Sequence, residues 1–582
     1  MKIELKNILD RYYSQYLKGY PQAIKKTVYL IIEKVIHLSE INDFLEKHED
    51  KTGLAFNDEI LEYLNFSYVA SKKDRDKIPS EGRLICVSNH PLGGIDGCVL
   101  VKMISEVRPD VKIVVNDIVK NVENLNGIFL TYNIDDRKIQ RKNIQQISRS
   151  LLNEEAIIIF PAGEVSRPTL KGIKDTNWKK GALFLSKKFN APVLPVYVKA
   201  KNSFLFYLLS VLNKKLSTIL LPHEIFNKNG KSAMIKIGDP IPSEAFNSNY
   251  WKEKYNTKLL KKHVLLIGKE KNGIFKTNKN IISPVSRKVL IKQLDYCELL
   301  GTSGDNKKIY HLQYDAAPDV VTEIARLREI TFRKVGEGTG QKIDIDKYDR
   351  YYHHIILWDE KELEIAGAYR LALCRDISYS SDRNDFYTSS LFKYTEDLIR
   401  VLPESIELGR SFVQAKYWNT NALDSLWQGI GLFINIIGDI KYLYGAVSIS
   451  NKYPEEAKNL IVYFYKKWFS GIDSFALAKN KYFIPEKVEQ KLNATLTSAS
   501  YKEDLQMVKK LLKIYSLSIP VLFKQYTELC EEGGVNFSDF CIDYNFQSCI
   551  DGFIFIKLEF LKESKKRRYK LYMKQFEIVD DF

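Results

Sequence analysis

The sequence predicts an α/β fold divided into two domains. Its 582 residues exceed what one hydrophobic core usually organises. Short runs rich in β-branched and aromatic residues alternate with helical stretches twice along the chain, which is typical of α/β proteins. A polar stretch rich in Lys and Asn separates the two series at residues 243–305. We therefore expect a domain at residues 1–275, a linker at 276–305 and a second domain at 306–582.

The first domain begins with helices and continues as a mainly parallel sheet. Apolar side chains recur at helical spacing within residues 1–70, so this segment packs on its own domain or lies against a membrane. From Arg83 onward, helical stretches separate short β-rich runs, and such alternation favours parallel pairing. The predicted strands are Leu84–Ser88, Lys112–Val115, Ala156–Phe160, Val193–Val198 and Ala233–Ile237.

The second domain repeats the α/β pattern from Lys308 onward. The pattern predicts a helix from about residue 421 to 441, and it predicts a helix followed by a strand within residues 500–582. The basic cluster Lys565–Arg568 lies near the end of the chain and meets an acidic protein, meets anionic lipid headgroups or is simply solvated. The predicted strands are His354–Trp358, Ile365–Leu373, Ser405–Leu408 and Tyr444–Ser448.

Composition and charge limit the binding partners and the cellular compartment that the sequence predicts. Lys plus Arg number 88 against 72 Asp plus Glu, and this excess suits nucleic acid, an anionic membrane or an acidic protein. The seven cysteines are scattered without a Cys-x-x-Cys pair, which predicts a reducing cytosol and neither disulfides nor zinc. The opening residues lack a signal peptide. The longest apolar run, Phe204–Leu212, is too short to span a bilayer and is either a core helix or an interfacial element.

A histidine and an aspartate follow the first predicted strand. The segment Asn89 to Gly97 reads NHPLGGIDG, so His90 lies at the carboxyl end of a strand, where α/β sheets place their ligands. Asp96 falls at the start of the next helix, close enough to orient the imidazole. A histidine held by a carboxylate can act as general base for a hydroxyl. Alone, one His and one Asp in a glycine-rich turn are more often structural.

Two further segments strengthen the catalytic interpretation. Residues 159–167 read IFPAGEVSR, in which Gly163 permits close backbone approach and Arg167 can bind an anion. Residues 191–196 read APVLPV, a strand bracketed by prolines. With the His90 segment, in this order and spacing, they resemble the boxes of the lysophospholipid acyltransferase family. Residues 127–137, from Gly127-Ile128-Phe129 to Asp136-Arg137, resemble the intervening box.

This resemblance, over about residues 20–240, implies an O-acyltransferase. It implies that His90 is the general base, that Asp96 orients it, and that Arg137 and Arg167 bind the acceptor together with the box containing Gly163 and Glu164. The donor it implies is an acyl thioester attacked directly by a hydroxyl. Five residues separate His90 from Asp96 where the family has four, and Ala162 replaces the usual Glu. These departures favour an acceptor other than a glycerol phosphate.

A second group of charged residues begins at Arg328. It includes the acidic, glycine-rich stretch through Asp344, Asp346 and Asp349, which lacks the closing Glu of an EF-hand loop, so calcium is disfavoured. Further on, Gly367 to Leu371 (GAYRL), Glu407 to Ser411 (ELGRS) and Leu426 to Gly431 (LWQGIG) follow. Together these segments resemble the acyl-homoserine-lactone synthases and ornithine N-acyltransferases, which have a GNAT-like fold. The matching residues are Arg328, Phe332, Asp346, Asp349, Arg370, Glu407 and Arg410.

That second resemblance, over about residues 305–450, implies an N-acyltransferase. Its donor is an acyl chain on acyl carrier protein, although acyl-CoA is an alternative, and its acceptor is an amino acid amine. Glu407 is a plausible base for the amine, directly or through water. The stretch holding Gln428, Gly429 and Gly431 is expected at a helix N-terminus, where N–H groups would bind the phosphopantetheine phosphate.

The order of the two domains resembles that of the bifunctional aminolipid synthases. We expect the second domain to join a 3-hydroxyacyl group to an amino acid, and the first to esterify the 3-hydroxyl, giving an ornithine or glycine lipid. The resemblance calls for neither metal nor bound cofactor. The expected partners are acyl carrier protein and the inner face of the cytoplasmic membrane, without nucleic acid. The alternative is a phospholipid acyltransferase whose second half only recruits carrier protein or membrane.

Overall fold

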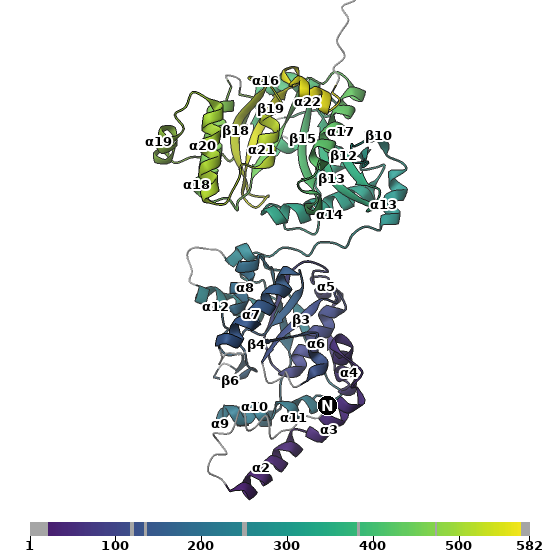
Figure 1. Ribbon diagram of the computed structural model, residues 1–582, viewed down its shortest axis with the longest axis vertical. Helices are drawn as coiled ribbons and strands as arrows, with labels where there is room; N and C mark the ends of the chain where they lie inside the picture. Colours follow the sequence, from purple (N-terminus) through teal and green to yellow (C-terminus); the bar gives the residue numbers. More distant parts are fainter. Residues whose placement is uncertain are drawn as a thin grey trace, which may run out of the picture. The chain divides into compact units, whose positions relative to one another are not determined.

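The computed structural model describes residues 21–116, 122–132, 137–170, 172–246, 253–380, 384–471 and 474–571. The chain divides into two compact units, Met1–Asn280 and Ile281–Phe582. Each combines a sheet with helices, so the expected α/β fold in two units is confirmed (Figure 1). Among the described residues, no helix combines the length and apolar character that crossing a bilayer requires.

The first unit is built on a seven-stranded sheet that is parallel except for the pairing of β8 with β9. The order across the sheet is β1 (Ser67–Val69), β9 (Ser232–Ile237), β8 (Val193–Lys199), β2 (Leu84–Ser88), β5 (Ala156–Ile159), β3 (Val111–Asn116) and β4 (Phe129–Tyr132). The mainly parallel sheet predicted from the sequence is therefore correct, and β2 has its predicted bounds. A small hairpin follows β5, formed by β6 (Arg167–Thr169) and β7 (Gly172–Lys174).

Helices cover both faces of this sheet. Successive residues of a strand point to opposite faces, so Cys86 of β2 joins one core while Ile85 joins the other. Helices α4 (Gly53–Tyr63) and α6 (Gly94–Ser105) cover the first face; α7 (Arg137–Leu152), α8 (Gly181–Phe189) and α12 (Glu253–Ile267) cover the second. The other helices among the described residues of this unit are α2 (Gln22–Val35), α3 (Leu38–Lys47), α5 (Lys72–Arg75), α9 (Phe204–Leu212), α10 (Lys214–Ile219) and α11 (Leu221–Phe226).

The second unit is built on an eight-stranded sheet in which every neighbouring pair is antiparallel except β15 with β16. The order across the sheet is β10 (Glu298–Thr302), β11 (Lys308–Gln313), β12 (His353–Asp359), β13 (Glu364–Leu373), β15 (Ser405–Val413), β16 (Tyr442–Ile449), β19 (Cys549–Lys557) and β18 (Val535–Asp543). Strands β14 (Phe392–Tyr394) and β17 (Ala476–Ala478) form a separate pair.

Strands β15 and β16 part midway along their length. Their pairing ends at Leu408 and Gly445, after which β15 continues beside β13 and β16 continues beside β19. At this point a Cβ on Gly445 would lie 2.2 Å from the carbonyl oxygen of Leu408, so only glycine fits. The opening between two diverging strands leaves backbone groups unpaired by the ladder and gives a natural place for a ligand.

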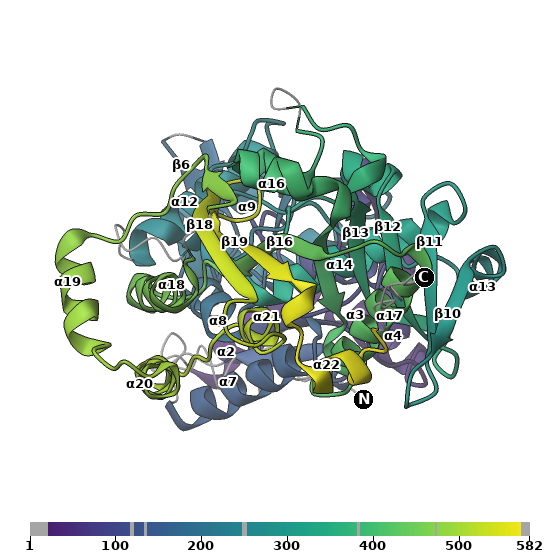
Figure 2. The ribbon, with the colours of Figure 1, turned by 90° about the horizontal axis from the view of Figure 1, so that it is seen from above.

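Helices also cover both faces of the second sheet. Helix α14 (Pro318–Val335) packs on one face, while α17 (Ala422–Ile437) and α18 (Glu455–Phe469) pack on the other. Helix α18 lies beside β18, and α19 (Glu486–Thr495) and α20 (Tyr501–Ile514) contact α18 on its far side, as Figure 2 shows. The remaining helices are α13 (Arg287–Leu294), α15 (Tyr387–Leu391), α16 (Glu396–Val401), α21 (Val521–Thr527) and α22 (Glu563–Arg568).

The stretch expected to be a linker, 276–305, contains regular structure. Helix α13 and strand β10 both fall inside it, and Leu290 and Leu294 are buried against α14. The two lysines of α13, Lys288 and Lys292, are exposed, while the buried Leu290 and Leu294 form a short apolar stripe at helical spacing. The second unit therefore begins before the residue at which the polar composition ends.

Candidate functional sites

The loop after β2 brings His90 and Asp96 together. Gly93 has a φ of +91°, a conformation that side chains rarely adopt, and it turns the chain directly into α6. Gly94 is already helical, so one glycine accommodates the additional residue of this motif. Asp96 lies in the first turn of α6, where its carboxylate also caps the helix by accepting from the N–H of Leu92 at 2.7 Å and of Gly93 at 3.2 Å.

The His90 imidazole is held in one orientation. Its Nδ1 lies 3.1 Å from Oδ2 of Asp96, whose side chain has no exposed surface, whereas the imidazole retains 17%. The ring stacks on Phe160 at 4.0 Å between centroids. Burial raises the pKa of Asp96, and the hydrogen bond from His90 opposes that rise. A carboxylate at Nδ1 favours a proton on that nitrogen, and Nε2 can then accept one from a substrate.

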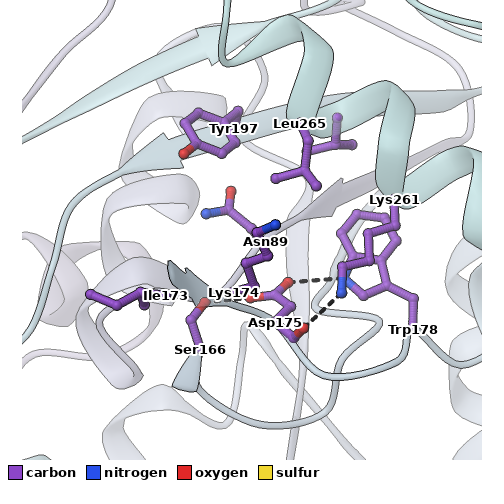
Figure 3. Close-up of a pocket in the computed structure, with 10 residues that line it drawn as sticks. Asn89, Ser166, Ile173, Lys174, Asp175, Trp178, Tyr197, Lys261 and Leu265 are labelled. Atoms are coloured by element: carbon purple, nitrogen blue, oxygen red, sulfur yellow. Dashed lines mark hydrogen bonds between the residues drawn. The ribbon is translucent and has the colours of Figure 1, made fainter. Parts of the chain in front are cut away.

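A second aspartate, Asp175, supports the same loop, and sequence reasoning missed it. Its Oδ1 accepts from the His90 N–H at 3.2 Å and from the Ser166 hydroxyl, and its Oδ2 accepts from Trp178 Nε1 at 2.8 Å. The Ser166 N–H donates to the His90 carbonyl at 2.8 Å, so the two motif loops are joined. Figure 3 shows Ser166, Asp175 and Trp178 among the residues that line a cavity of about 30 Å³, which is too small for a substrate. Asp175 is therefore a scaffold for His90.

Arg167 is held within the protein by hydroxyl groups. Its guanidinium donates to Ser210 Oγ at 2.8 Å, to Ser217 Oγ and to Thr218 Oγ1 at 3.1 Å, and it lies 5.1 Å over the ring of Phe206. These partners come from α9 and α10, so the guanidinium joins those helices to the β6–β7 hairpin. They carry no negative charge, and burial lowers the pKa of Arg167.

The other expected acceptor residues of the first unit come from two segments, the turn after β5 and the start of α7. Gly163 has a φ of +70°, as a tight turn after β5 requires. Glu164 forms an ion pair with Lys214 at 2.5 Å. Arg137 begins α7, and its side chain lies outside the described residues.

In the second unit, the predicted arginines and aspartates form one buried cluster. Arg328 makes two hydrogen bonds of 2.9 Å to the carboxylate of Asp349, and Arg370 reaches the same carboxylate at 3.2 Å. Burial alone would raise the pKa of Asp349, but the two guanidinium groups hold it well below its usual range. Arg370 also donates to Asp346 at 2.6 Å. The carboxylates that a calcium-binding loop would use as metal ligands are therefore paired with arginines.

Arg410 extends this cluster to the opening between β15 and β16. It lies two residues beyond Leu408, the last residue of β15 that pairs with β16. Its φ is +49°, a strained conformation for arginine. Its guanidinium lies 3.3 Å from Asp344, 4.5 Å over the ring of Tyr387 and 4.6 Å over the ring of Phe546. Phe332 packs edge-on against Phe546 at 5.1 Å, so the predicted aromatic residue supports Arg410 indirectly.

Glu407 lies close to this cluster, but the protein already occupies its carboxylate. Its Oε1 accepts from the Thr388 N–H at 2.6 Å, and its Oε2 accepts from the Tyr352 hydroxyl and the Tyr387 N–H. Burial raises the pKa of Glu407. These contacts hold the N-terminus of α15, where Tyr387 meets Arg410. The geometry favours a positioning role over direct contact with the amine.

Carboxylates that sequence reasoning missed surround Arg410 and Tyr387. Tyr387 donates its hydroxyl to Asp543 at 3.1 Å, and Ser448 donates to Asp551 at 2.6 Å. Burial, followed by the charge of Asp543, raises the pKa of Asp551 to about 6. Burial, followed by the charge of Asp551, raises the pKa of Glu337 to about 8. Carboxyl groups with such pKa values can exchange protons near neutral pH.

The raised pKa of Glu337 predicts a pH-dependent stability. Its protonated form is favoured in the folded state, so the stabilisation is complete below the ordinary value of 4.5 and is lost as pH rises through about 8. The thermal midpoint should therefore fall by a few degrees between pH 6 and pH 8, a window above the pKa of Asp551. Scanning calorimetry of Glu337→Gln should show a flatter profile; the exposed Glu528→Gln should behave as wild type. If the thermal midpoint of all three proteins falls equally between pH 6 and pH 8, Glu337 does not have a raised pKa.

The expected phosphate-binding stretch is corrected by the structure. Helix α17 begins at Ala422, so Gln428, Gly429 and Gly431 lie in its interior, where backbone N–H groups are bonded within the helix. Both glycines serve packing, because a Cβ on Gly429 would lie 2.6 Å from Ile355 and one on Gly431 would lie 2.0 Å from the Tyr569 carbonyl. The N-terminus of this helix lies instead at about residue 422, where the N–H of Ala422 is bonded to Thr420 Oγ1 at 3.2 Å.

This packing role gives a direct prediction. Gly431→Ala should destabilise the second unit by about 1–3 kcal/mol, because its methyl group would overlap a carbonyl oxygen. Gly304→Ala is the control, since a Cβ there has no neighbour within 4 Å. Urea unfolding of both variants measures the difference. A Gly431→Ala protein as stable as Gly304→Ala would show that the contact with Tyr569 is absent.

Comparisons with known proteins agree with the two units. Residues 23–267 match the family model described as an acyltransferase, and residues 327–428 match the acetyltransferase (GNAT) domain. The crystal structure of the 1-acyl-sn-glycerophosphate acyltransferase from Thermotoga maritima is 17% identical and covers 37% of this chain and 80% of its own. Its TM-score of 0.24 is too low to carry an argument.

Two bacterial relatives are closer in sequence. A glycine N(alpha)-acyltransferase of Bacteroides thetaiotaomicron is 32% identical over 302 residues, which cover 50% of this chain and 89% of the relative. A lyso-glycine lipid O-acyltransferase of the same organism is 31% identical over 234 residues, which cover 39% of this chain and 85% of the relative. Because this chain matches most of the length of each relative, it belongs to the family of aminolipid-forming acyltransferases that they represent, and it is a bifunctional N- and O-acyltransferase.

Proposed function

We propose that the protein makes a glycine lipid in two steps. The second unit joins a 3-hydroxyacyl group to the amine of glycine, and the first unit then esterifies the 3-hydroxyl of that amide with a second acyl chain. The observation that carries this proposal is the pairing of His90 with Asp96 in one unit and the buried Arg328–Asp349–Arg370 cluster in the other. The names of the two relatives support glycine as the amino acid.

The O-acyl transfer follows from the orientation of His90. Its Nε2 takes the proton of the 3-hydroxyl while the oxygen attacks the thioester carbonyl, and the carbon–sulfur bond breaks when the tetrahedral intermediate collapses. The departing thiolate receives the proton from the imidazolium, so His90 is neutral again. Asp96 stabilises the imidazolium through the 3.1 Å contact, and its burial strengthens that attraction.

The contacts of Arg167 fit an acceptor without a phosphate. Three hydroxyl groups of the protein already use donors of its guanidinium, whereas a phosphate would need several free, charge-assisted donors. We therefore infer that Arg167 is a positioning residue, which holds α9 through Ser210 next to the second motif. The carboxylate of a glycine lipid carries a single charge, and we retain Arg137, Gly163 and Glu164 as candidates for contact with the acceptor.

The arginine cluster supports an amino acid acceptor in the second unit. The Nε and one terminal nitrogen of Arg370 are buried and have no hydrogen-bond partner among the described residues. Such donors suit the carboxylate of the amino acid. With Arg410 at the opening between β15 and β16, they would hold the amine beside a thioester entering from that opening. We propose that Glu407, by holding α15, keeps Tyr387 against Arg410.

We propose acyl carrier protein as the donor and the cytoplasmic membrane face as the place of action. Helix α22 carries the basic cluster Lys565–Arg568, and it meets the first turn of α17, where Arg568 pairs with Asp424 at 2.5 Å. That turn is the N-terminus of α17, where the helix dipole favours an anion, so a phosphopantetheine phosphate and an acidic carrier would lie side by side. Acyl-CoA shares the phosphate but lacks the acidic protein.

Expression in a bacterium that lacks aminolipids tests the two-step proposal. With ¹³C-labelled glycine in the medium, mass spectrometry of the lipids should show a labelled diacyl species and a labelled monoacyl amide. Labelled ornithine fed to a parallel culture should not enter either. Incorporation of ornithine would replace glycine as the acceptor. A changed phospholipid acyl composition without any amide-linked lipid would favour the phospholipid acyltransferase alternative and overturn the proposal.

A further inference from the structure

Helix α9 presents an apolar face to solvent. Phe204 is 81% exposed, Leu208 47% and Leu212 74%, and these positions share one side of a helix. Leu205 and Val211 widen the same face, while Phe206 and Tyr207 on the opposite side are buried. Exposed apolar patches of this kind are rare on monomeric proteins and mark interaction sites.

Two further apolar elements belong to the same end of the first unit. Leu170 is fully exposed at the turn of the β6–β7 hairpin, and β6 contacts α9. Leu30 and Ile31 of α2 are also more than half exposed, and the α2–α3 pair packs against Ile219 of α10. In Figure 1, α2, α3, α9 and α10 lie together at this end of the unit. We refer to Leu30, Ile31, Leu170 and the exposed residues of α9 as the apolar face.

The apolar face is connected directly to the His90 site. Ser210 of α9 and Thr218 of α10 hold Arg167, and the buried side of α9 packs on Val165. The neighbouring Ser166 donates its N–H to the carbonyl of His90. Three consecutive residues of the second motif therefore join the exposed helix to the general base.

We propose that the apolar face lies in the headgroup–acyl boundary of a lipid bilayer and presents the lipid acceptor to His90. A nine-residue helix is too short to span a membrane, but it can lie in the plane of the interface. Exposed Lys26 and Lys34 on α2 and Lys201 before α9 supply the positive charge that anionic headgroups attract. The identity of the acceptor rests on the proposed function, whereas the docking of this surface does not.

Vesicle co-sedimentation of the full-length protein tests the docking surface. With vesicles of phosphatidylglycerol and phosphatidylethanolamine, Leu208→Gln/Leu212→Gln should bind at least tenfold more weakly than wild type. The matched control is Leu152→Gln, an exposed leucine that ends α7 before the start of β5, whereas His90 follows the opposite, carboxyl end of the parallel neighbour β2. Wild-type binding by the double variant would overturn the proposal.

Two more measurements separate docking from catalysis and from self-association. The double variant should O-acylate a short-chain, monomeric 3-hydroxyacyl-glycine acceptor at the wild-type rate, and it should be slower only on acceptor embedded in vesicles. If neither protein O-acylates any acceptor while vesicle binding still depends on Leu208 and Leu212, the proposed function fails and the docking surface stands. If light scattering shows a wild-type dimer that the double variant loses, with equal vesicle binding, the face is a protein interface and the proposal falls.

Discussion

Replacing His90 by Ala should stop the second acylation and leave the first intact. In the proposed mechanism the imidazole takes the hydroxyl proton, and a positioned general base contributes about a hundred- to ten-thousand-fold in rate. The buried Asp96 keeps its two backbone donors without His90, so α6 should remain capped. Lipid extracts of cells expressing His90→Ala should therefore contain the monoacyl amide and almost none of the diacyl product.

A second histidine of the same unit provides the control. His48 is partly buried and lies 3.4 Å from Glu59, away from the motif loops. His48→Ala should keep both products at wild-type levels if the loss in His90→Ala is chemical. Diacyl product at the wild-type level from a folded His90→Ala protein would remove His90 from the mechanism.

Neutralising Asp349 should have the largest effect on the second unit. Its carboxylate separates the guanidinium groups of Arg328 and Arg370, all three side chains being almost completely buried. Asp349→Asn would leave two buried cations without their shared anion, and breaking such a buried pair costs about 3–5 kcal/mol. We expect a lower thermal midpoint and no amide-linked lipid in cells.

The first unit should remain active in the same protein. When Asp349→Asn is supplied with a synthetic monoacyl amide, O-acyl transfer should continue, because His90 and its supports belong to the other unit. Glu360→Gln, which loses an exposed pair with Lys308, should change stability by less than about 0.5 kcal/mol. The cluster would be dispensable if Asp349→Asn unfolded at the same temperature as wild type and still formed the amide.

Local sequence patterns were sufficient to predict the first site's central pair. His90 and Asp96 are six positions apart, and the strand–turn–helix that brings them together is visible in the spacing of apolar residues and glycines. Asp175 was missed because it lies 85 positions away in an irregular segment, with no pattern that ties it to His90. The Arg167 contacts were missed for the same reason, since they come from α9 and α10.

The second site was predicted only as far as its motif residues. Arg328, Asp349 and Arg370 do meet, but Asp551 reaches Ser448 from a strand 103 positions later, and only the sheet order brings β19 beside β16. Gln428 and Gly431 were misplaced because a glycine-rich stretch suggests a helix start as readily as close packing inside a helix. The neighbours that decide this, Tyr569 and Ile355, are distant in sequence.

The division of the chain into two compact units has a consequence for the cell. When two enzymes of a sequence are separate proteins, unequal synthesis or degradation lets the intermediate accumulate. Here one message specifies one copy of each unit, so their ratio is fixed at synthesis. A monoacyl amide is a single-chain amphiphile, of the kind that disturbs bilayers, and a fixed ratio limits its concentration without any separate control of expression.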